Sequence, residues 1–288
     1  KRKKIRRLLS CMAIFLSIFP SFPNFFLHPV KAGTLEQAVM VTIFDPEGDK
    51  FMLETIAEPF EEGETAFDLL AKLDQKGIVD FEYTTDPKFG ASITRFNDVS
   101  IGETEYWNFV VNGVPASLGI SNYKLAQGDH LLFVLTDWTN PPQELKATVS
   151  ITGPLGEDVI PETEVTLVPG STAYDALKQA ALIHQLALDV AIDSQWLAYL
   201  QDINDLLPDN EYWIFYLNDE YMQGGLTSYT MRQGDSLRAE APLSQDSGNH
   251  SKNPGEKEKK PIFSISVGKI NDAIEKARDY LTKTNSLD

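Results

Sequence analysis

The feature that most restricts the fold of this chain is an internal repeat of about a hundred residues. The stretch "EYWNFVVNG" from Glu105 returns as "EYWIFYLND" from Glu211, and "GISNYKLAQGD" from Gly119 returns as "GLTSYTMRQGD" from Gly225. From Glu105 to Leu131, eleven positions are identical in the second copy, which is well above chance. We therefore expect both copies to form the same series of elements.

Each copy is predicted to contain the elements of a β-grasp fold, a mixed sheet that clasps one helix. Two strands joined by a Pro/Gly-rich turn open each copy. A helix follows, because Thr65 with Asp68, and Thr172 with Asp175, have the spacing of a capping box. Further strands come next, and Asn112-Gly113 is a strong hairpin signal. Since one helix covers only one face of a sheet, the expected fold class is α+β with two tandem β-grasp-like domains.

The chain divides into five predicted segments. Residues 1–32 have the layout of a signal peptide. Residues 39–138 and 147–242 are the two repeated domains, and residues 243–261 form a polar, Pro/Gly/Ser-rich linker. Residues 262–288 are expected to form an amphipathic helix, because apolar residues recur there at helical spacing.

The leader prediction rests on a basic cluster, an apolar run from Leu8 to Phe19 and a small-residue exit at Val30-Lys31-Ala32. An uncleaved membrane anchor, or lipidation at Cys11, are the alternatives. Without the leader, 18 basic and 42 acidic residues remain and no cysteine, so the net charge is −24. Such a surface repels nucleic acid and anionic lipid, and the chain then lacks a thiol nucleophile. We expect a secreted or cell-envelope protein of a Gram-positive-type bacterium.

Strand alternation separates the aromatic residues of the repeated hairpin into two groups. Trp107 shares a face with Phe109, and Trp213 occupies the equivalent position, so both tryptophans are predicted to be core residues. Tyr106 and Tyr212 point to the opposite face, which the helix of the same copy does not cover. These tyrosines are expected either to stack on a planar ligand or to pack the two domains together.

The loop after each hairpin supplies a second group of candidates. Gly119 and Gly225 are each followed, four residues later, by Tyr123 and Tyr229. A glycine there permits a positive φ or a close approach of a ligand to the backbone, although a plain turn is the alternative. Trp138 ends the last strand of the first copy, so it is expected at the domain joint or over a ligand.

The repeated motif resembles the C-terminal β-domain of the transcobalamin and intrinsic-factor family. The motif consists of an aromatic pair, a hairpin, a glycine, a tyrosine and Gly-Asp, and in the first copy it ends at Trp138. In that family the β-domain closes over a corrinoid that is held on a separate α/α toroid. The resemblance therefore implies cobalamin as the favoured ligand, with residues 262–288 as the start of a truncated toroid and a toroid domain as a partner. Asp219 in place of Gly113, and the lack of a second Trp138, are departures in copy two. The implied ligand-binding residues are Tyr106, Trp107, Gly119, Tyr123, Trp138, Tyr212, Trp213, Gly225 and Tyr229.

Catalysis finds no support in the sequence motifs. There is no phosphate-binding glycine loop, no His-Glu-x-x-His and no Gly-x-Ser-x-Gly, although a Ser–His–Asp arrangement assembled by folding stays open. His130 and His184 are isolated, so no metal site or bound cofactor is expected. The preferred hypothesis is a non-enzymatic, exported ligand-binding protein. The alternatives are a structural or protein-interaction module of the cell surface, and an accessory domain of an enzyme.

Overall fold

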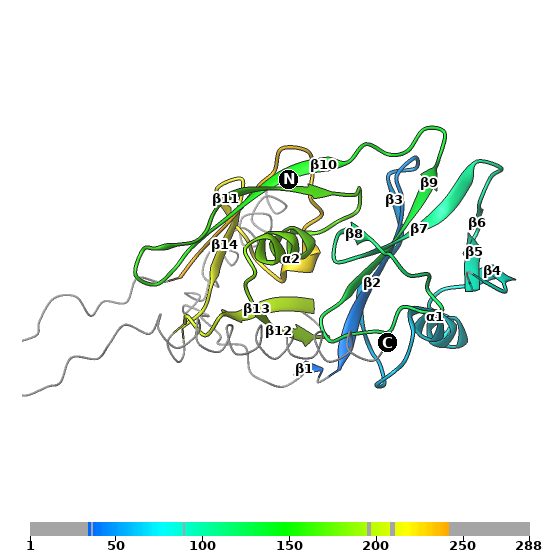
Figure 1. Cartoon of the computed structure of the whole chain (residues 1–288), viewed down its shortest axis with the longest axis horizontal. Helices are drawn as coiled ribbons and strands as arrows, with labels where there is room; N and C mark the ends of the chain where they lie inside the picture. Colours follow the sequence, from blue (N-terminus) through cyan, green and yellow to red (C-terminus); the bar gives the residue numbers. More distant parts are fainter. Residues whose placement is uncertain (1–33, 36, 89, 195–196, 208–210, 242–288) are drawn as a thin grey trace, which may run out of the picture. The chain divides into compact units, whose positions relative to one another are not determined.

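The computed structural model describes residues 34–241 except 36, 89, 195–196 and 208–210 (Figure 1). These residues belong to one of the two compact units of the chain, Lys1–Leu243. The predicted signal peptide, linker and terminal helix lie outside the described residues. Strands predominate over helices, so the expected α+β class is confirmed in a β-rich form. Among the described helices, none combines the length and apolarity needed to cross a bilayer.

Repeat 1 builds a five-stranded mixed sheet, here named sheet 1, with the order β3-β2-β9-β7-β8. Strands β2 and β9 pair in parallel, and the other neighbours pair antiparallel. The parallel pair requires a crossover between the two strands, and this crossover contains the helix of the repeat. The strands are β2 Ala38–Asp45, β3 Lys50–Pro59, β7 Glu105–Val111, β8 Val114–Pro115 and β9 His130–Asp137.

Helix α1 (Ala66–Gln75) lies against one face of sheet 1 (Figure 1). It begins at the predicted capping box, in which the Thr65 side chain accepts from the Asp68 N–H and the Asp68 carboxylate accepts from the Thr65 N–H. Its buried leucines pack against alternate residues of β2. A small antiparallel sheet of β4 (Phe81–Asp86), β5 (Gly90–Phe96) and β6 (Val99–Ser100) contributes to the same core.

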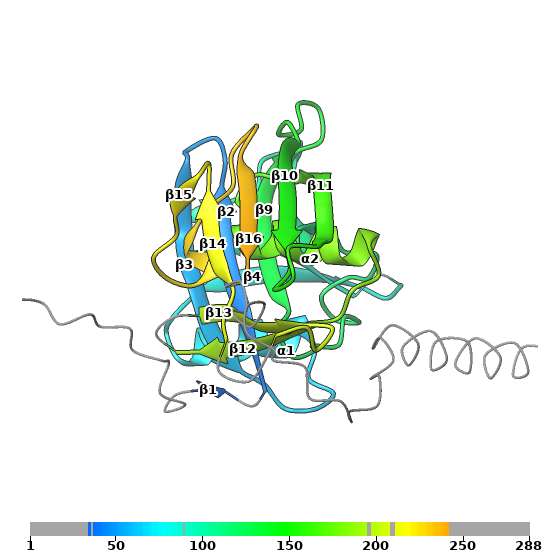
Figure 2. The same cartoon turned by 90° about the vertical axis from the view of Figure 1, so that its left-hand side faces the viewer.

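Repeat 2 builds sheet 2 with the matching order β11-β10-β16-β14-β15, seen side by side in Figure 2. Helix α2 (Ala173–Ile183) begins at the second capping box and packs on sheet 2. A short strand that precedes repeat 1, β1 (Thr34–Leu35), pairs with the small sheet of repeat 2. The remaining elements are β10 Leu145–Thr152, β11 Asp158–Leu167, β12 Leu188–Asp193, β13 Leu197–Ile203, β14 Ile214–Leu217, β15 Glu220–Tyr221, the 3-10 turn η1 Leu226–Ser228 and β16 Ser236–Glu240.

The hairpin turns of both repeats adopt the same backbone conformation. Asn112 and Gly113 have φ values of 50° and 79°, as a type I′ turn requires. Asn218 and Asp219 have φ values of 52° and 65°. Aspartate tolerates the left-handed region better than most residues, so its replacement of the glycine leaves the turn type unchanged.

As expected, α1 covers only one face of sheet 1; the second face is covered by repeat 2. Val110, Leu132 and Val134 on that face are at most 1% exposed, and Val168, just before α2, packs against their cluster. Met40 of β2 belongs to the same apolar core as α2 itself. Helix α2 therefore contacts both sheets, and we name its contact with sheet 1 the seam.

Polar contacts also cross the seam. The Nδ1 atom of His130 lies 2.8 and 3.0 Å from the two carboxylate oxygens of Asp175 on α2. The Tyr174 hydroxyl, on the first turn of α2, donates to the Gly128 carbonyl at 2.6 Å. His130 and Asp175 are both fully buried, so this pair is shielded from water. The seam thus combines apolar packing with specific hydrogen bonds that fix where α2 sits on sheet 1.

Candidate functional site

Several residues of the repeated motif form hydrogen bonds that hold the hairpin turn in place. The Asp129 carboxylate accepts from Asn112 Nδ2 at 3.0 Å and from the Tyr123 hydroxyl at 2.8 Å, and Asn112 Oδ1 accepts from the His130 N–H. Burial raises the pKa of the Tyr123 phenol, and the nearby Asp129 charge raises it further, so Tyr123 stays a hydrogen-bond donor. The Tyr123 hydroxyl is therefore committed to an internal bond.

Repeat 2 contains the equivalent Asn–Asp hydrogen bond. Asn218 Nδ2 donates to Asp235 at 2.9 Å, with the same separation of 17 residues along the chain. The Tyr229 hydroxyl differs, because it bonds to the backbone of Gln223 instead of Asp235. The sequence analysis missed this Asn–Asp pairing, although its recurrence at one fixed spacing in both copies was the signal that could have revealed it.

Of the alternatives for the loop glycines, a positive φ is not found. Gly225 has a φ of −73°, and Gly119 is not among the described glycines with a positive φ. The glycines that precede the paired aspartates, Gly128 and Gly234, do have positive φ values of 78° and 84°. The turn into the last strand therefore needs glycine, whereas the loop after the hairpin does not need it for backbone conformation.

The two hairpin tryptophans lie in the cores of their repeats, in agreement with the strand alternation. Trp107 is 7% exposed and Trp213 is 6% exposed. Trp107 contacts the Phe96 ring edge-on, with the ring centroids 5.0 Å apart. Both indole N–H groups are buried without a hydrogen-bond partner among the described residues. Neither ring presents a face to a ligand in this structure.

Tyr106 and Trp138 remain open, and together they form what we name the aromatic rim. Tyr106 is 41% exposed and pairs across the strands with Thr136, while Trp138 is 58% exposed and follows β9. Side chains that are diagonal neighbours on paired strands share a face, so both rings lie on the seam side of sheet 1. Their exposure shows that the seam does not extend over them. Tyr212 of repeat 2 is also exposed, at 47%.

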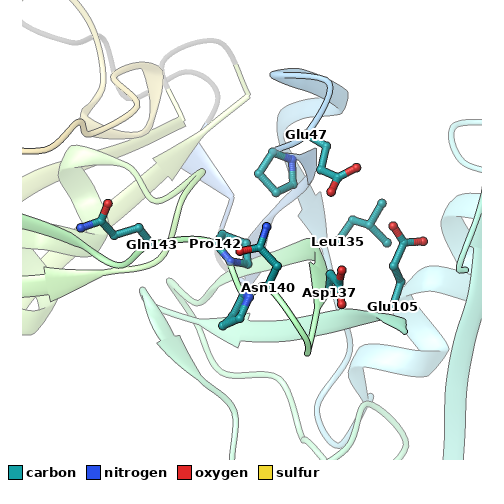
Figure 3. Close-up of a pocket in the computed structure, with 9 residues that line it drawn as sticks. Glu47, Glu105, Leu135, Asp137, Asn140, Pro142 and Gln143 are labelled. Carbon is teal, nitrogen blue, oxygen red and sulfur yellow. The ribbon is translucent and has the colours of Figure 1, made fainter. Parts of the chain in front are cut away.

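A pocket of about 320 Å³ lies where the ends of β7 and β9 meet the connection between the repeats (Figure 3). Glu105 and Asp137 line it together with Glu47. Because Glu105 and Asp137 pair with each other and alternate with Tyr106 and Thr136 along the strands, they lie on the face of sheet 1 opposite Tyr106. Figure 3 shows these carboxylates gathered around Leu135. The residues that line the pocket are Pro46, Glu47, Glu105, Leu135, Asp137, Asn140, Pro141, Pro142 and Gln143.

The electrostatics of this pocket are those of an acidic site. Hydrogen bonds from the Thr139 N–H and hydroxyl lower the pKa of Asp137, so this carboxylate stays ionised at neutral pH. No basic side chain lines the pocket. An anionic ligand is therefore disfavoured there, and a neutral or cationic group is favoured.

His130 and His184, the two histidines among the described residues, do not provide a site. His130 is fully buried, with Nδ1 at Asp175 and Nε2 at the Thr42 hydroxyl, 2.8 Å away, so both ring nitrogens are already engaged. His184 Nε2 is bonded to Thr163. Within the described residues, no group of three or more His, Cys, Asp or Glu side chains is arranged to hold a metal ion.

Comparison with known proteins gives limited matches. The chain is similar to haptocorrin in complex with Cbi, with 15% identity over 35% of this chain and 25% of that one and a TM-score of 0.30. It is also similar to a protein from Ruminococcus gnavus described as a candidate metal-binding protein, with 16% identity over 35% of this chain and 98% of that one and a TM-score of 0.27. The matched part thus spans a quarter of haptocorrin. No curated protein matches the chain. Residues 63–137 match the family model of a domain of unknown function, DUF4430.

Proposed function

We propose that this chain is an exported, non-enzymatic binding protein in which residues 39–138 and 147–242 are tandem β-grasp domains. The observation that carries the proposal is the exposed aromatic rim of repeat 1. Two large exposed rings offer apolar area on which a flat ligand can stack. The leader-like N-terminus supports export.

The favoured ligand is a corrinoid. Its flat macrocycle offers apolar area on which Tyr106 and Trp138 can stack. This choice is supported by the resemblance of the hairpin frame to the transcobalamin and intrinsic-factor family. In this proposal Trp107, Tyr123, Trp213 and Tyr229 shape the repeats from within. Gly119 and Gly225 have no assigned contact with the ligand.

A structural or protein-interaction role is the second candidate, and the seam favours it. The outer face of sheet 1 is already occupied by α2, so most of the surface first expected to receive a ligand serves to join the repeats. On this hypothesis the rim and Tyr212 contact a protein partner. A toroid domain, supplied by another chain or by a longer form of this one, is the partner that the family resemblance implies.

Cobalamin titration separates these proposals. We expect quenching of tryptophan fluorescence as cobalamin is added, because Trp138 is the exposed tryptophan among the described residues. Equilibrium dialysis then gives the affinity of the wild type and of the Tyr106→Ala and Trp138→Phe variants, both expected to bind more weakly. Tyr83→Ala, a comparably exposed tyrosine on β4, is the matched control. No binding up to about 1 mM, an interaction weaker than about 4 kcal/mol, would refute the corrinoid proposal.

A further inference from the structure

The outer face of sheet 2 carries a connected cluster of aromatic and charged side chains. Tyr216 on β14 lies between Tyr221 on β15 and Arg238 on β16, since it pairs with both across the strands. Phe215 and Leu217, the neighbours of Tyr216, pack on the apolar core with α2, so Tyr216 faces the other way. In Figure 2 this sheet faces the viewer and α2 lies behind it. We name Tyr216, Tyr221, Arg238 and Glu240 the outer cluster.

Its members hold one another in fixed positions. The Arg238 guanidinium lies over the Tyr216 ring, 4.0 Å from the centroid, and its Nη1 is 2.7 Å from a Glu240 carboxylate oxygen. The Tyr216 hydroxyl donates to the other Glu240 oxygen at 2.9 Å. Tyr221 meets the Tyr216 ring edge-on, with the centroids 6.3 Å apart. The Tyr221 side chain is 61% exposed, so the cluster presents an open ring beside ordered donors and acceptors.

The two repeats differ sharply at these positions. The equivalents of Tyr216, Arg238 and Glu240 in repeat 1 are Val110, Leu132 and Val134, which are buried under repeat 2. One sheet face has thus become an apolar docking surface for a helix. The other has become polar and aromatic, and no described element covers it. A helix docked as α2 docks on sheet 1 would bury the charges of Arg238 and Glu240, which makes a second such seam unfavourable.

We propose that the outer cluster binds a neutral glycan. The faces of sugar rings carry C–H groups that pack on aromatic rings, and their hydroxyls both donate and accept hydrogen bonds. Tyr221 and Tyr216 supply the rings, while Arg238 supplies donors and Glu240 supplies acceptors. An extended polysaccharide can lie along this open face of paired strands.

The charge pattern selects a neutral glycan over an anionic one. Arg238 is neutralised by Glu240, and Asp219 lies 3.8 Å from its Nε atom. Glu220 lies on β15 next to Tyr221. A carboxylated or sulfated polymer would therefore meet net negative charge at this face and across the acidic chain as a whole.

Affinity electrophoresis of the full chain tests this proposal. The gels contain a mixed-linkage β-glucan, a galactomannan or amylopectin as neutral polymers, and alginate as the anionic one. We expect at least one neutral polymer to retard the protein and alginate not to retard it. Retardation by none of the three neutral polymers, or by alginate alone, would overturn the proposal.

Variants then locate the site. Tyr221→Ala is expected to weaken binding about three- to tenfold, the value of one aromatic contact. Arg238→Leu gives the residue found in repeat 1 and should weaken binding as well. Tyr83→Ala on β4 and Trp138→Phe on the rim are the controls, and circular dichroism checks the fold of each variant. If the Trp138 variant loses glycan binding while the Tyr221 variant keeps it, the glycan site belongs to the rim and the outer-cluster proposal is wrong. Because corrinoid binding is measured separately on the rim, the two proposals fail independently.

Discussion

Replacing Asp175 with alanine should destabilise the protein far more than the same change at Asp68. Both aspartates occupy the third position of a helix whose capping threonine they bond, so the loss of the capping box is common to both variants. Asp68 is exposed and has no charged partner across a seam, whereas Asp175 is fully buried against His130. The comparison therefore isolates the contribution of the pair.

The expected magnitudes follow from these environments. Asp68→Ala should cost about 1 kcal/mol, as removal of a helix cap does. Asp175→Ala should cost about 3–5 kcal/mol, because it leaves a buried imidazole without its partner. His130→Leu in the Asp175→Ala background should recover part of this loss, since an apolar side chain needs no partner there.

Urea denaturation, followed by tryptophan fluorescence and circular dichroism, measures five proteins: the wild type, Asp68→Ala, Asp175→Ala, His130→Leu and the Asp175→Ala/His130→Leu double variant. The reasoning is refuted if Asp175→Ala and Asp68→Ala cost the same, or if the two substitutions at the pair are additive. Additivity would mean that His130 and Asp175 are neighbours without energetic coupling.

Two further predictions concern the seam and the hairpins. Lys178 on α2 is largely buried, which lowers its pKa, although the Asp129 and Asp175 charges act in the opposite direction. Its ammonium lies 5.5 Å from the Tyr174 ring centroid. Lys178→Met should therefore raise the free energy of unfolding by about 1 kcal/mol at pH 7. The pKa of this lysine is lower in the folded state than in the unfolded state, so the wild type gains stability as the pH rises through the folded-state pKa. The stability advantage of the methionine variant should therefore shrink toward pH 10. Denaturation curves in which the wild type and the variant differ equally at pH 7 and pH 10 would contradict a buried, charged Lys178. Asn112→Ala removes bonds to Asp129 and to the His130 N–H and should cost about 2 kcal/mol, with Asn218→Ala as the parallel variant in repeat 2.

Local signals predicted the elements of each repeat well. Thr65 with Asp68 marked a helix start, and Asn112-Gly113 marked a hairpin, because these residues act through contacts a few positions away. Strand alternation likewise placed Trp107 in the core and Tyr106 outside it. Such patterns report on one strand or one turn and need no knowledge of distant contacts.

Packing of the two domains was one of the expected alternatives, but the residues of the seam and its covering element, α2, were not predicted, because the seam joins residues that are far apart in the chain. A local signal for it existed. The run "HLLFVLT" from His130 is apolar on both strand faces, whereas its equivalent "SLRAE" from Ser236 alternates. A strand that is apolar on both faces indicates burial on both sides. The identity of the covering element is a tertiary property, and no spacing within either repeat specifies it.

Because α2 packs on both sheets, the two halves of the protein differ in the apolar surface that they expose during synthesis. All strands of sheet 1 have been synthesised once β9 has left the ribosome. Helix α2, which covers the second face of this sheet, begins some 35 residues later in the chain. Until then Leu132, Val134 and Val110 are exposed to solvent and to other nascent chains. The C-terminal half, whose outer surface is polar, carries no comparable hazard. A chain cut after residue 138 should therefore aggregate, because the second, apolar face of sheet 1 stays exposed although every strand of that sheet is present.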